Sequence, residues 1–312
     1  MTSVVHGTGK YEQLLVRCRD LAPVPTAVAH PCEKSALEAA AQGLITPILV
    51  GPAARIAEVA DHARLSLDQL RIVDTPNSHA AAAKAVELVR MGEAELLMKG
   101  SLHTDELLGA VVAREAGLRT GRRFSHVFIM DVPTYHKVLI ITDAAINIAP
   151  TLEEKVDICQ NAIDLAVSLG VGRPKVAILA AVETVTSRMP ATIDAACLCK
   201  MAERGQITSG VLDGPLAFDN AISRDAAATK GSRSEVAGDP DILLAPDLEA
   251  GNILAKQLTF LANADSAGLV LGARVPIILT SRADTVRARI ASCAIAMLVA
   301  HARRRALVAA AS

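Results

Sequence analysis

The polar residues best placed for chemistry follow an apolar run near the C-terminal end of the sequence. The run, Val275–Leu279, is typical of a buried strand, and it ends abruptly in a segment that contains Ser281, Arg282 and Asp284. Ligands of open α/β sheets bind at the carboxyl ends of strands, so these side chains are candidates for a site. The planar fork of an arginine matches phosphate oxygens, and a carboxylate can accept a proton. The pattern therefore indicates chemistry on a phosphate-bearing substrate.

A second candidate is a loop between a predicted strand and a predicted helix. The strand at 96–98 is followed by Lys99, Gly100 and Ser101, and the helix at 105–116 follows its expected cap, Thr104. The lysine, the hydroxyl and the helix N-terminus could face one anion. An ordinary strand–loop–helix connection explains these residues equally well, so the loop alone leaves both interpretations open.

Arginines and small polar residues precede another apolar run, at 127–130. Arg119, Arg122 and Ser125 lie in this segment. A solvated run of charge is the usual explanation. The functional alternative is a binding site for the phosphates of a nucleotide-bearing cofactor, because arginine forks bind phosphate oxygens.

Carboxylate and amide side chains follow two further predicted strands. Asp219 and Asn220 come after a strand at 209–212, and Asp247 and Asn252 come after a strand at 241–245. Turn chemistry explains each pair on its own, but their recurrence at strand ends favours a functional site. Such carboxylates could bind a divalent metal, yet strand-end turns explain them as well, so we assign no metal site.

The composition argues against a nucleic-acid-binding protein, a membrane protein and a disulfide-stabilised protein. The 312 residues carry a formal net charge of −1, without the basic surplus typical of nucleic-acid-binding proteins. The apolar run at 290–300 is shorter than the roughly 20 residues of a membrane helix, and no signal peptide is visible. The six scattered cysteines need no disulfide framework. We therefore expect a cytoplasmic protein that binds neither membranes nor nucleic acid.

Helices and strands alternate along the sequence, which predicts an α/β fold with mostly parallel sheets and flanking helices. Near Asp143 a loop leads into the capped start of a helix. No further strands are predicted beside the last predicted helix. We expect two lobes: a discontinuous first domain of residues 1–143 plus 281–312, and a second domain of residues 144–280. The site is expected in an active-site cleft between them.

Five segments resemble the phosphate acetyltransferase and phosphate butyryltransferase family. They occur in the family's order and read LLMKGSLHT (96–104), RTGRRFSHVFIMDVP (119–133), ITDAAINIAPTLEEK (141–155), DGPLAFDNAIS (213–223), and DILLAPDLEAGNIL with PIILTSRAD (241–254 and 276–284). The resemblance implies transfer of a short acyl group, acetyl to butyryl, between coenzyme A and inorganic phosphate, giving acyl phosphate. It also implies a two-lobed fold like that of the isocitrate and isopropylmalate dehydrogenases, and a homodimer or higher homo-oligomer. Coenzyme A would be a substrate, and no cofactor would be bound permanently.

The resemblance also assigns roles to residues. Ser281 and Arg282 match the family's Ser-Arg pair, which stabilises the tetrahedral intermediate and binds phosphate. Asp284 is the candidate base. The Ser-Arg-Ala-Asp sequence is closer to the butyryl branch, because the base of the acetyl branch lies further along the chain. Residues expected to bind the substrates are Lys99, Gly100, Ser101, Arg119, Arg122, Ser125, Asp219, Asn220, Asp247 and Asn252.

A coenzyme A thiol, with a pKa near that of Cys at about 8.5, needs a base to become a thiolate. No cysteine lies in the motif segments, so we expect direct thiolate attack in a ternary complex. The alternative is a non-catalytic acyl-CoA-sensing module, since domains of this family occur fused to malic enzymes. A nicotinamide-dependent decarboxylating dehydrogenase of the same fold would need an adenosine site and a carboxylate metal cluster, and neither is convincing here.

Overall fold

The computed structural model describes residues 9–31, 35–63, 66–68, 70–280 and 284–311. Its contacts divide the chain into two compact units. Unit 1 consists of Met1–Lys10 and Arg123–Ser266, and unit 2 consists of Tyr11–Arg122 and Ala267–Ser312. The chain therefore changes unit after Lys10, after Arg122 and after Ser266, whereas the boundaries expected from the sequence were at residues 143 and 280.

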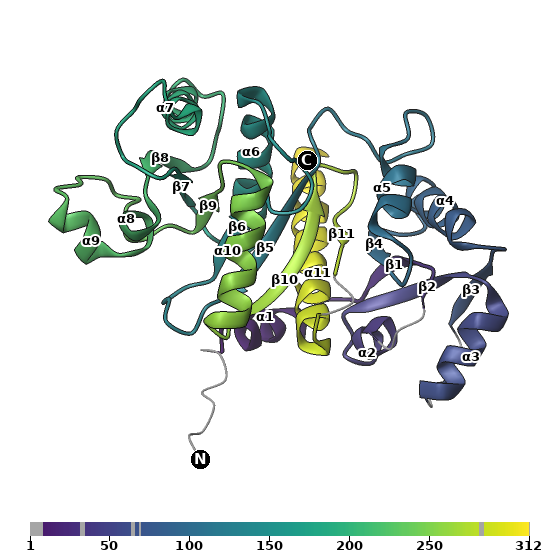
Figure 1. The fold of residues 1–312 in the computed structure, drawn as a ribbon. Coiled ribbons are helices and arrows are strands. Elements are labelled where there is room, and N and C mark those ends of the chain that lie inside the picture. Colours follow the sequence, from purple (N-terminus) through teal and green to yellow (C-terminus); the bar gives the residue numbers. More distant parts are fainter. Residues whose placement is uncertain (1–8, 32–34, 64–65, 69, 281–283, 312) are drawn as a thin grey trace, which may run out of the picture. The chain divides into compact units, whose positions relative to one another are not determined.

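Unit 2 is built on a mostly parallel sheet with the strand order β3-β2-β1-β4-β11-β10 (Figure 1). Only the β10–β11 pair is antiparallel among the ladders recorded for these strands. The strands are β1 (Val24–Ala29), β2 (Ile45–Gly51), β3 (Arg71–Asp74), β4 (Leu96–Lys99), β10 (Asp265–Leu271) and β11 (Ile277–Ile278). The helices are α1 (Lys10–Cys18), α2 (Ser35–Ala41), α3 (Ala53–Ala63), α4 (Ser78–Arg90), α5 (Thr104–Val112) and α11 (Val286–Ala311).

Unit 1 has the strand order β5-β6-β9-β7-β8, in which β5 and β6 form an antiparallel pair and the other pairs are parallel. Because β6 pairs with β9, the β5–β6 hairpin belongs to this sheet, which is why the unit begins before residue 143. The strands are β5 (Ser125–Asp131), β6 (Leu139–Thr142), β7 (Lys175–Leu179), β8 (Val211–Leu216) and β9 (Ile242–Leu244). The helices are α6 (Leu152–Ser168), α7 (Pro190–Glu203), α8 (Phe218–Ile222), α9 (Arg224–Thr229) and α10 (Leu248–Leu261).

Apolar runs and local caps explain these elements. Strands β4, β6 and β9 are buried along their whole length, as expected for parallel strands covered on both faces. The Asn77 side chain accepts the N–H of Ala80 and so begins α4. Thr151 and Glu154 form a reciprocal capping box at the start of α6. The mixed α/β fold with mostly parallel sheets is thus confirmed.

The cap expected at Thr104 is wrong. Helix α5 is capped by His103, whose N–H donates to Glu106 at 2.8 Å, and Thr104 is its first residue. Helix α11 begins at Val286, and the hydroxyl of Thr285 accepts the N–H of Ala288. The last helix therefore begins several residues after Thr280 and Ser281, and its N-terminal amides follow Asp284 in the chain.

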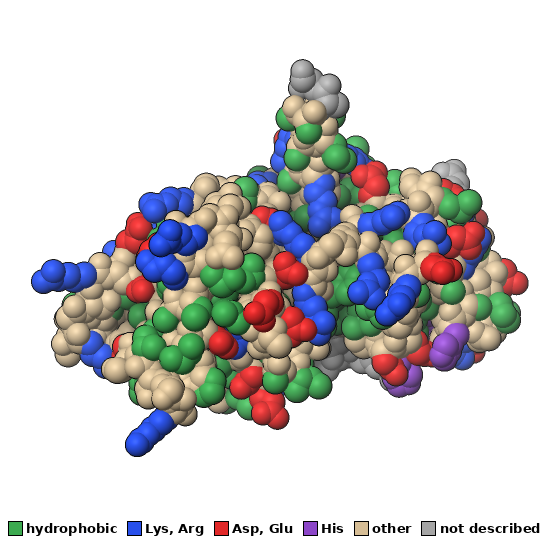
Figure 2. Space-filling model, turned by 90° about the horizontal axis from the view of Figure 1, so that it is seen from above, with side chains coloured by type: hydrophobic (Ala, Val, Ile, Leu, Met, Phe, Trp, Pro, Cys, Tyr) green, Lys and Arg blue, Asp and Glu red, His purple; other side chains and the backbone are tan. Residues whose placement is uncertain are grey.

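Basic and acidic side chains are interspersed on the face shown in Figure 2, in keeping with a formal net charge of −1. Within the described part of the chain, no helix is long and apolar enough to cross a membrane.

Candidate active site

The carboxyl ends of β1, β4 and β11 lie side by side in unit 2. Ala29 pairs with Lys99, and Ile278 pairs with Met98 on the other side of β4. The chain therefore leaves three adjacent parallel strands at one edge of the sheet. Two of the segments that leave, at Lys99–Ser101 and after β11, are those that the sequence had singled out.

Gly100 lets the backbones at this edge approach closely. Its N–H donates to Ala29 O at 2.9 Å. A Cβ at this position would lie 2.3 Å from His30 O and 2.5 Å from Ala29 O, which no real side chain tolerates. Glycine is therefore required here by the packing of one strand end against its neighbour.

Ser101 is joined to His30 by three hydrogen bonds. The Ser101 N–H donates to His30 O at 2.9 Å, and its hydroxyl donates to the same oxygen at 3.1 Å. The hydroxyl oxygen also lies 2.7 Å from Nδ1 of His30. Lys99, the last residue of β4, is buried, and its ammonium donates to Gly100 O at 3.0 Å. A hydroxyl, a cation and an imidazole thus come together at the end of β4.

The C-terminal motif is described only in part. Ser281 and Arg282 lie outside the described residues. Asp284 is half-buried and stands two residues before α11. Of the two arginines assigned to this unit, Arg119 is exposed and its backbone bridges to Ala273, and Arg122 is exposed and donates its N–H to Thr120 Oγ1 at 3.1 Å.

In unit 1, Asp143 organises the loop that follows β6. It is buried, and its carboxylate accepts the N–H groups of Ala145 and Ile146 at 2.9 and 3.0 Å, as well as the side-chain amide of Asn147. The Asn147 carbonyl in turn accepts Nε of Arg123 at 2.7 Å. The loop and the arginine that precedes β5 are thereby held together at one edge of the sheet.

Three of the expected binding residues have structural partners at this edge. Ser125 is fully buried, and its hydroxyl accepts Nδ2 of Asn161 at 3.0 Å. Asp247 caps α10 by accepting the N–H of Ala250 at 2.8 Å. Asn252 donates to Ala144 O at 2.9 Å. Each of these contacts shapes the loops at the strand ends.

Asp219 and Asn220 belong to a charged cluster with Glu183 and Lys230. The Asn220 side-chain amide donates to Glu183, and among the described residues its buried carbonyl oxygen has no hydrogen-bond partner. The Lys230 ammonium lies 2.9 Å from Glu183 and 3.4 Å from Asp219. The hydrogen bond from Lys230 lowers the pKa of Glu183, and the hydrogen bond from the Asn220 backbone lowers the pKa of Asp219. Both carboxylates are accordingly held in their charged form.

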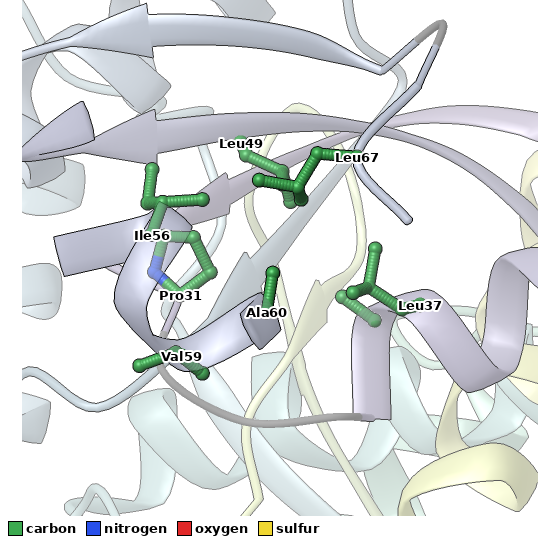
Figure 3. A pocket seen from close by; sticks show the side chains of 8 residues that line it. Pro31, Leu37, Leu49, Ile56, Val59, Ala60 and Leu67 are labelled. Atoms are coloured by element: carbon green, nitrogen blue, oxygen red, sulfur yellow. The ribbon is translucent and has the colours of Figure 1, made fainter. Parts of the chain in front are cut away.

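One cavity of unit 2 is apolar, and the side chains that bind metals are dispersed within the described ranges. A cavity of about 20 Å³ in unit 2 is lined only by apolar side chains from around β2, α2 and α3 (Figure 3), and it has room for about one water molecule. Within the described ranges, no three His, Cys, Asp or Glu side chains are grouped as a metal site would require.

Sequence reasoning missed His30, Asp143 and Glu183. His30 follows β1 and Asp143 follows β6, so the strand-end rule that selected Ser101 also applied to them. Glu183 follows β7 at a distance of four residues. Its link to Asn220 depends on the pairing of β7 with β8, which spacing along the chain does not reveal.

Comparisons with known proteins agree on one family. A family model described as phosphate acetyl/butaryl transferase matches residues 75–297. The chain is 65% identical over 305 residues to a phosphate acetyltransferase of Rhizobium meliloti, covering 96% of each chain. It is 42% identical over 287 residues to a phosphate butyryltransferase of Clostridium acetobutylicum, covering 91% of this chain and 95% of that one.

A solved structure of a phosphotransacylase is also similar to this chain. A branched-chain phosphotransacylase from Enterococcus faecalis superposes with a TM-score of 0.78 at 30% identity, covering 89% of this chain and 99% of that one. A 4-hydroxythreonine-4-phosphate dehydrogenase from Klebsiella pneumoniae has a TM-score of 0.56 at 11% identity, which shows a shared fold alone.

Proposed function

Because this chain belongs to the phosphate acetyl/butyryltransferase family, we propose that it transfers an acetyl group between coenzyme A and inorganic phosphate. That it is a phosphate acyltransferase follows from the family. The acetyl preference rests on one observation: the identity is 65% with a relative named an acetyltransferase and 42% with one named a butyryltransferase. The Ser-Arg-Ala-Asp sequence, which is closer to the butyryl branch, weighs less than similarity along the whole chain.

The reaction exchanges one bond to the acyl carbon for another. In one direction a phosphate oxygen attacks the thioester carbonyl, the C–S bond breaks, and the thiolate of coenzyme A leaves and takes up a proton. In the other direction a base removes the thiol proton, the thiolate attacks acetyl phosphate, and phosphate leaves. Both directions pass through an oxyanion that hydrogen-bond donors stabilise.

The residues of unit 2 supply groups suited to each step. Arg282 would bind the phosphate through its planar fork, and Ser281 would donate to the oxyanion. Asp284 is half-buried and would serve as the base that takes the thiol proton. Lys99 and Ser101 at the end of β4 would add donors for the phosphate.

Direct transfer in a ternary complex is favoured over an acyl intermediate on Cys18, Cys159, Cys199 or Cys293. Burial raises the pKa of Cys18 to about 11 and those of Cys199 and Cys293 to about 12, and it raises the pKa of Cys159 as well. Thiols with such pKa values are almost wholly protonated near neutral pH and are poor nucleophiles. Initial rates with both substrates varied should give intersecting lines, and parallel lines would indicate a covalent intermediate.

The remaining assignments follow from the same reaction. Coenzyme A is a substrate of the family, and we propose that no further cofactor or metal is bound permanently. The described cysteines are free thiols, which fits a reducing compartment such as the cytoplasm. A homodimer or higher homo-oligomer is proposed, and light scattering on the purified protein would test it.

The deciding experiment measures phosphate-dependent release of free thiol from acetyl-, propionyl- and butyryl-CoA by the purified protein. We expect release only when phosphate is present, and fastest release with acetyl-CoA. Faster release from butyryl-CoA would overturn the acetyl preference. Binding of acyl-CoA without any release would favour the sensing module instead.

A further inference from the structure

His30 holds an unusual backbone conformation where β1 ends. Its φ of +51° lies in the left-handed region, which residues with a Cβ rarely adopt because it costs free energy. Within the described residues it shares a positive φ only with Ser209, Asn263 and glycines. Its N–H donates to Val50 O at 2.7 Å, so a neighbouring strand end helps to hold it in place. Such strain persists where the surrounding structure imposes it, and it is common at functional sites.

The contacts of His30 fix the direction of the Ser101 hydroxyl. The hydroxyl has one hydrogen, and His30 provides two acceptors for it: its own carbonyl oxygen at 3.1 Å and Nδ1 at 2.7 Å. When the hydrogen points to the carbonyl, the Nδ1–H of the ring donates to the hydroxyl oxygen instead. In this arrangement the Nδ1–H holds the Ser101 oxygen in place, and the hydroxyl hydrogen can turn from the carbonyl oxygen to a phosphate oxygen.

Ser101 stands at the edge of the sheet where the resemblance places the phosphate chemistry. It follows buried Lys99 at the end of β4 and precedes α5. Strand β4 pairs in parallel with β11, from whose end the chain continues to Ser281 and Arg282. On the other side of the ring, Nε2 of His30 has no hydrogen-bond partner among the described residues. Among the described residues, the hydrogen bond of the imidazole is therefore the one to Ser101.

We propose that His30 is a positioning residue for the acyl transfer, orienting the Ser101 hydroxyl toward a phosphate group of the substrates. The inference rests on the proposed function, because it takes Ser101 to contact substrate. The phosphate is either the inorganic phosphate that accepts the acyl group or a phosphate of coenzyme A. Hydroxyl recognition is the same for both, and separate Michaelis constants distinguish them.

The test compares His30→Ala, His30→Asn and Ser101→Ala in the purified full-length protein. The amide of Asn reaches the position of Nδ1 and offers either a donor or an acceptor, and Asn tolerates a positive φ better than other residues with a Cβ. We expect His30→Ala and Ser101→Ala each to lower kcat/KM about 10-fold, as loss of a hydrogen bond to a charged group does. His30→Asn should retain most of the activity, and the double variant should lose no more than either single one.

Asn263 supplies a matched control for the backbone. Its φ is also +51°, it is exposed, and it lies at the C-terminal end of α10. Asn263→Ala therefore carries the strain of alanine at this φ without touching Ser101. His30→Ala and Asn263→Ala should lower the melting temperature comparably, while only His30→Ala loses activity.

The Michaelis constants decide which substrate is contacted. A rise in KM confined to inorganic phosphate assigns the contact to the acyl acceptor, and a rise confined to coenzyme A assigns it to the phosphates of that substrate. Wild-type kinetics in His30→Ala, or losses that multiply in the double variant, would overturn the inference. So would failure of His30→Asn to restore activity although it folds normally. If the unaltered protein shows no phosphate-dependent turnover, the proposed function fails, and the inference fails with it.

Discussion

The Lys10 ammonium lies 2.9 Å from the Asp131 carboxylate, with side chains only 9% and 0% exposed. The ammonium also donates to Val132 O at 2.8 Å and to Tyr135 O at 2.6 Å, and the Lys10 N–H donates to the other Asp131 oxygen at 3.1 Å. All donors of the ammonium are thus used inside unit 1. Lys10, which belongs to unit 1, is therefore anchored at the end of β5.

Lys10→Met should remove this anchor and the ammonium group that pairs with the buried Asp131 carboxylate. Breaking a buried pair in this way costs about 3–5 kcal/mol of the free energy of unfolding. Urea denaturation of the two proteins measures the difference. Lys200→Met is the control, because Lys200 and Glu203 are 62% and 63% exposed and such pairs contribute less than about 1 kcal/mol. Equal losses for the two variants would contradict a special role for Lys10.

Gly100→Ala should be destabilising and should also lower activity. The added methyl group would overlap His30 O and Ala29 O, which belong to the backbone and cannot rotate away. Overpacking of this kind typically costs about 1–3 kcal/mol. Gly109→Ala within α5 is the control, because nothing lies within 4 Å of its added methyl group. That change should stabilise the protein by about 0.5–1 kcal/mol, and a similar gain for Gly100→Ala would refute the close approach.

The lowered pKa of Asp239 predicts how the free energy of unfolding changes at low pH. Burial raises its pKa, but hydrogen bonds from Lys175 and Lys137 outweigh burial and hold the pKa well below the usual value. The carboxylate therefore adds stability above the unfolded-state pKa of about 3.9, and this contribution is lost as the pH falls through the lower folded-state value.

The free energy of unfolding should decline below about pH 4, and Asp239→Asn should be less stable at pH 7 by at least about 1 kcal/mol with a flatter decline in acid. Urea unfolding at pH 3, 4 and 7 measures both effects. Asp20→Asn is the control, since Asp20 is exposed and forms no ion pair within the described residues. If the free energy of unfolding of Asp239→Asn declined in acid as steeply as that of the wild type, other groups would determine the loss of stability at low pH.

Part of the fold and of the candidate site could be predicted from the sequence, because apolar runs mark buried strands and polar residues at the strand ends mark candidate binding residues. Apolar runs located β4 and β9, because strands covered on both faces consist of apolar residues. The edge strand β3 went unnoticed, since three of its four residues are exposed or polar. The strand-end rule also selected Ser101 and Asn220. Their partners, His30 and Glu183, lie 71 and 37 positions away in sequence, and only the strand order brings them together.

Direct transfer predicts that no acetyl group accumulates on the protein. Desolvation raises the pKa values of Cys199, which is half-buried, and Cys293, which is buried, to about 12. Incubation with acetyl-CoA in the absence of phosphate should leave the intact mass unchanged by mass spectrometry. Cys199→Ala should retain activity within about twofold, since a protonated thiol contributes no nucleophile. A stoichiometric acetyl adduct would instead place a covalent intermediate on the pathway.

Arg282→Ala should abolish turnover while leaving the fold intact. A guanidinium that binds phosphate stabilises charge in the transition state, and loss of one such donor lowers the rate by about 10²–10³-fold. The melting temperature should stay within a few degrees of the wild type, as it should for Arg55→Ala, whose side chain is 61% exposed on α3. Kinetics with inorganic phosphate and acetyl-CoA varied separately would locate the defect. A large fall in melting temperature would make Arg282 a structural residue, and full activity would remove it from the site.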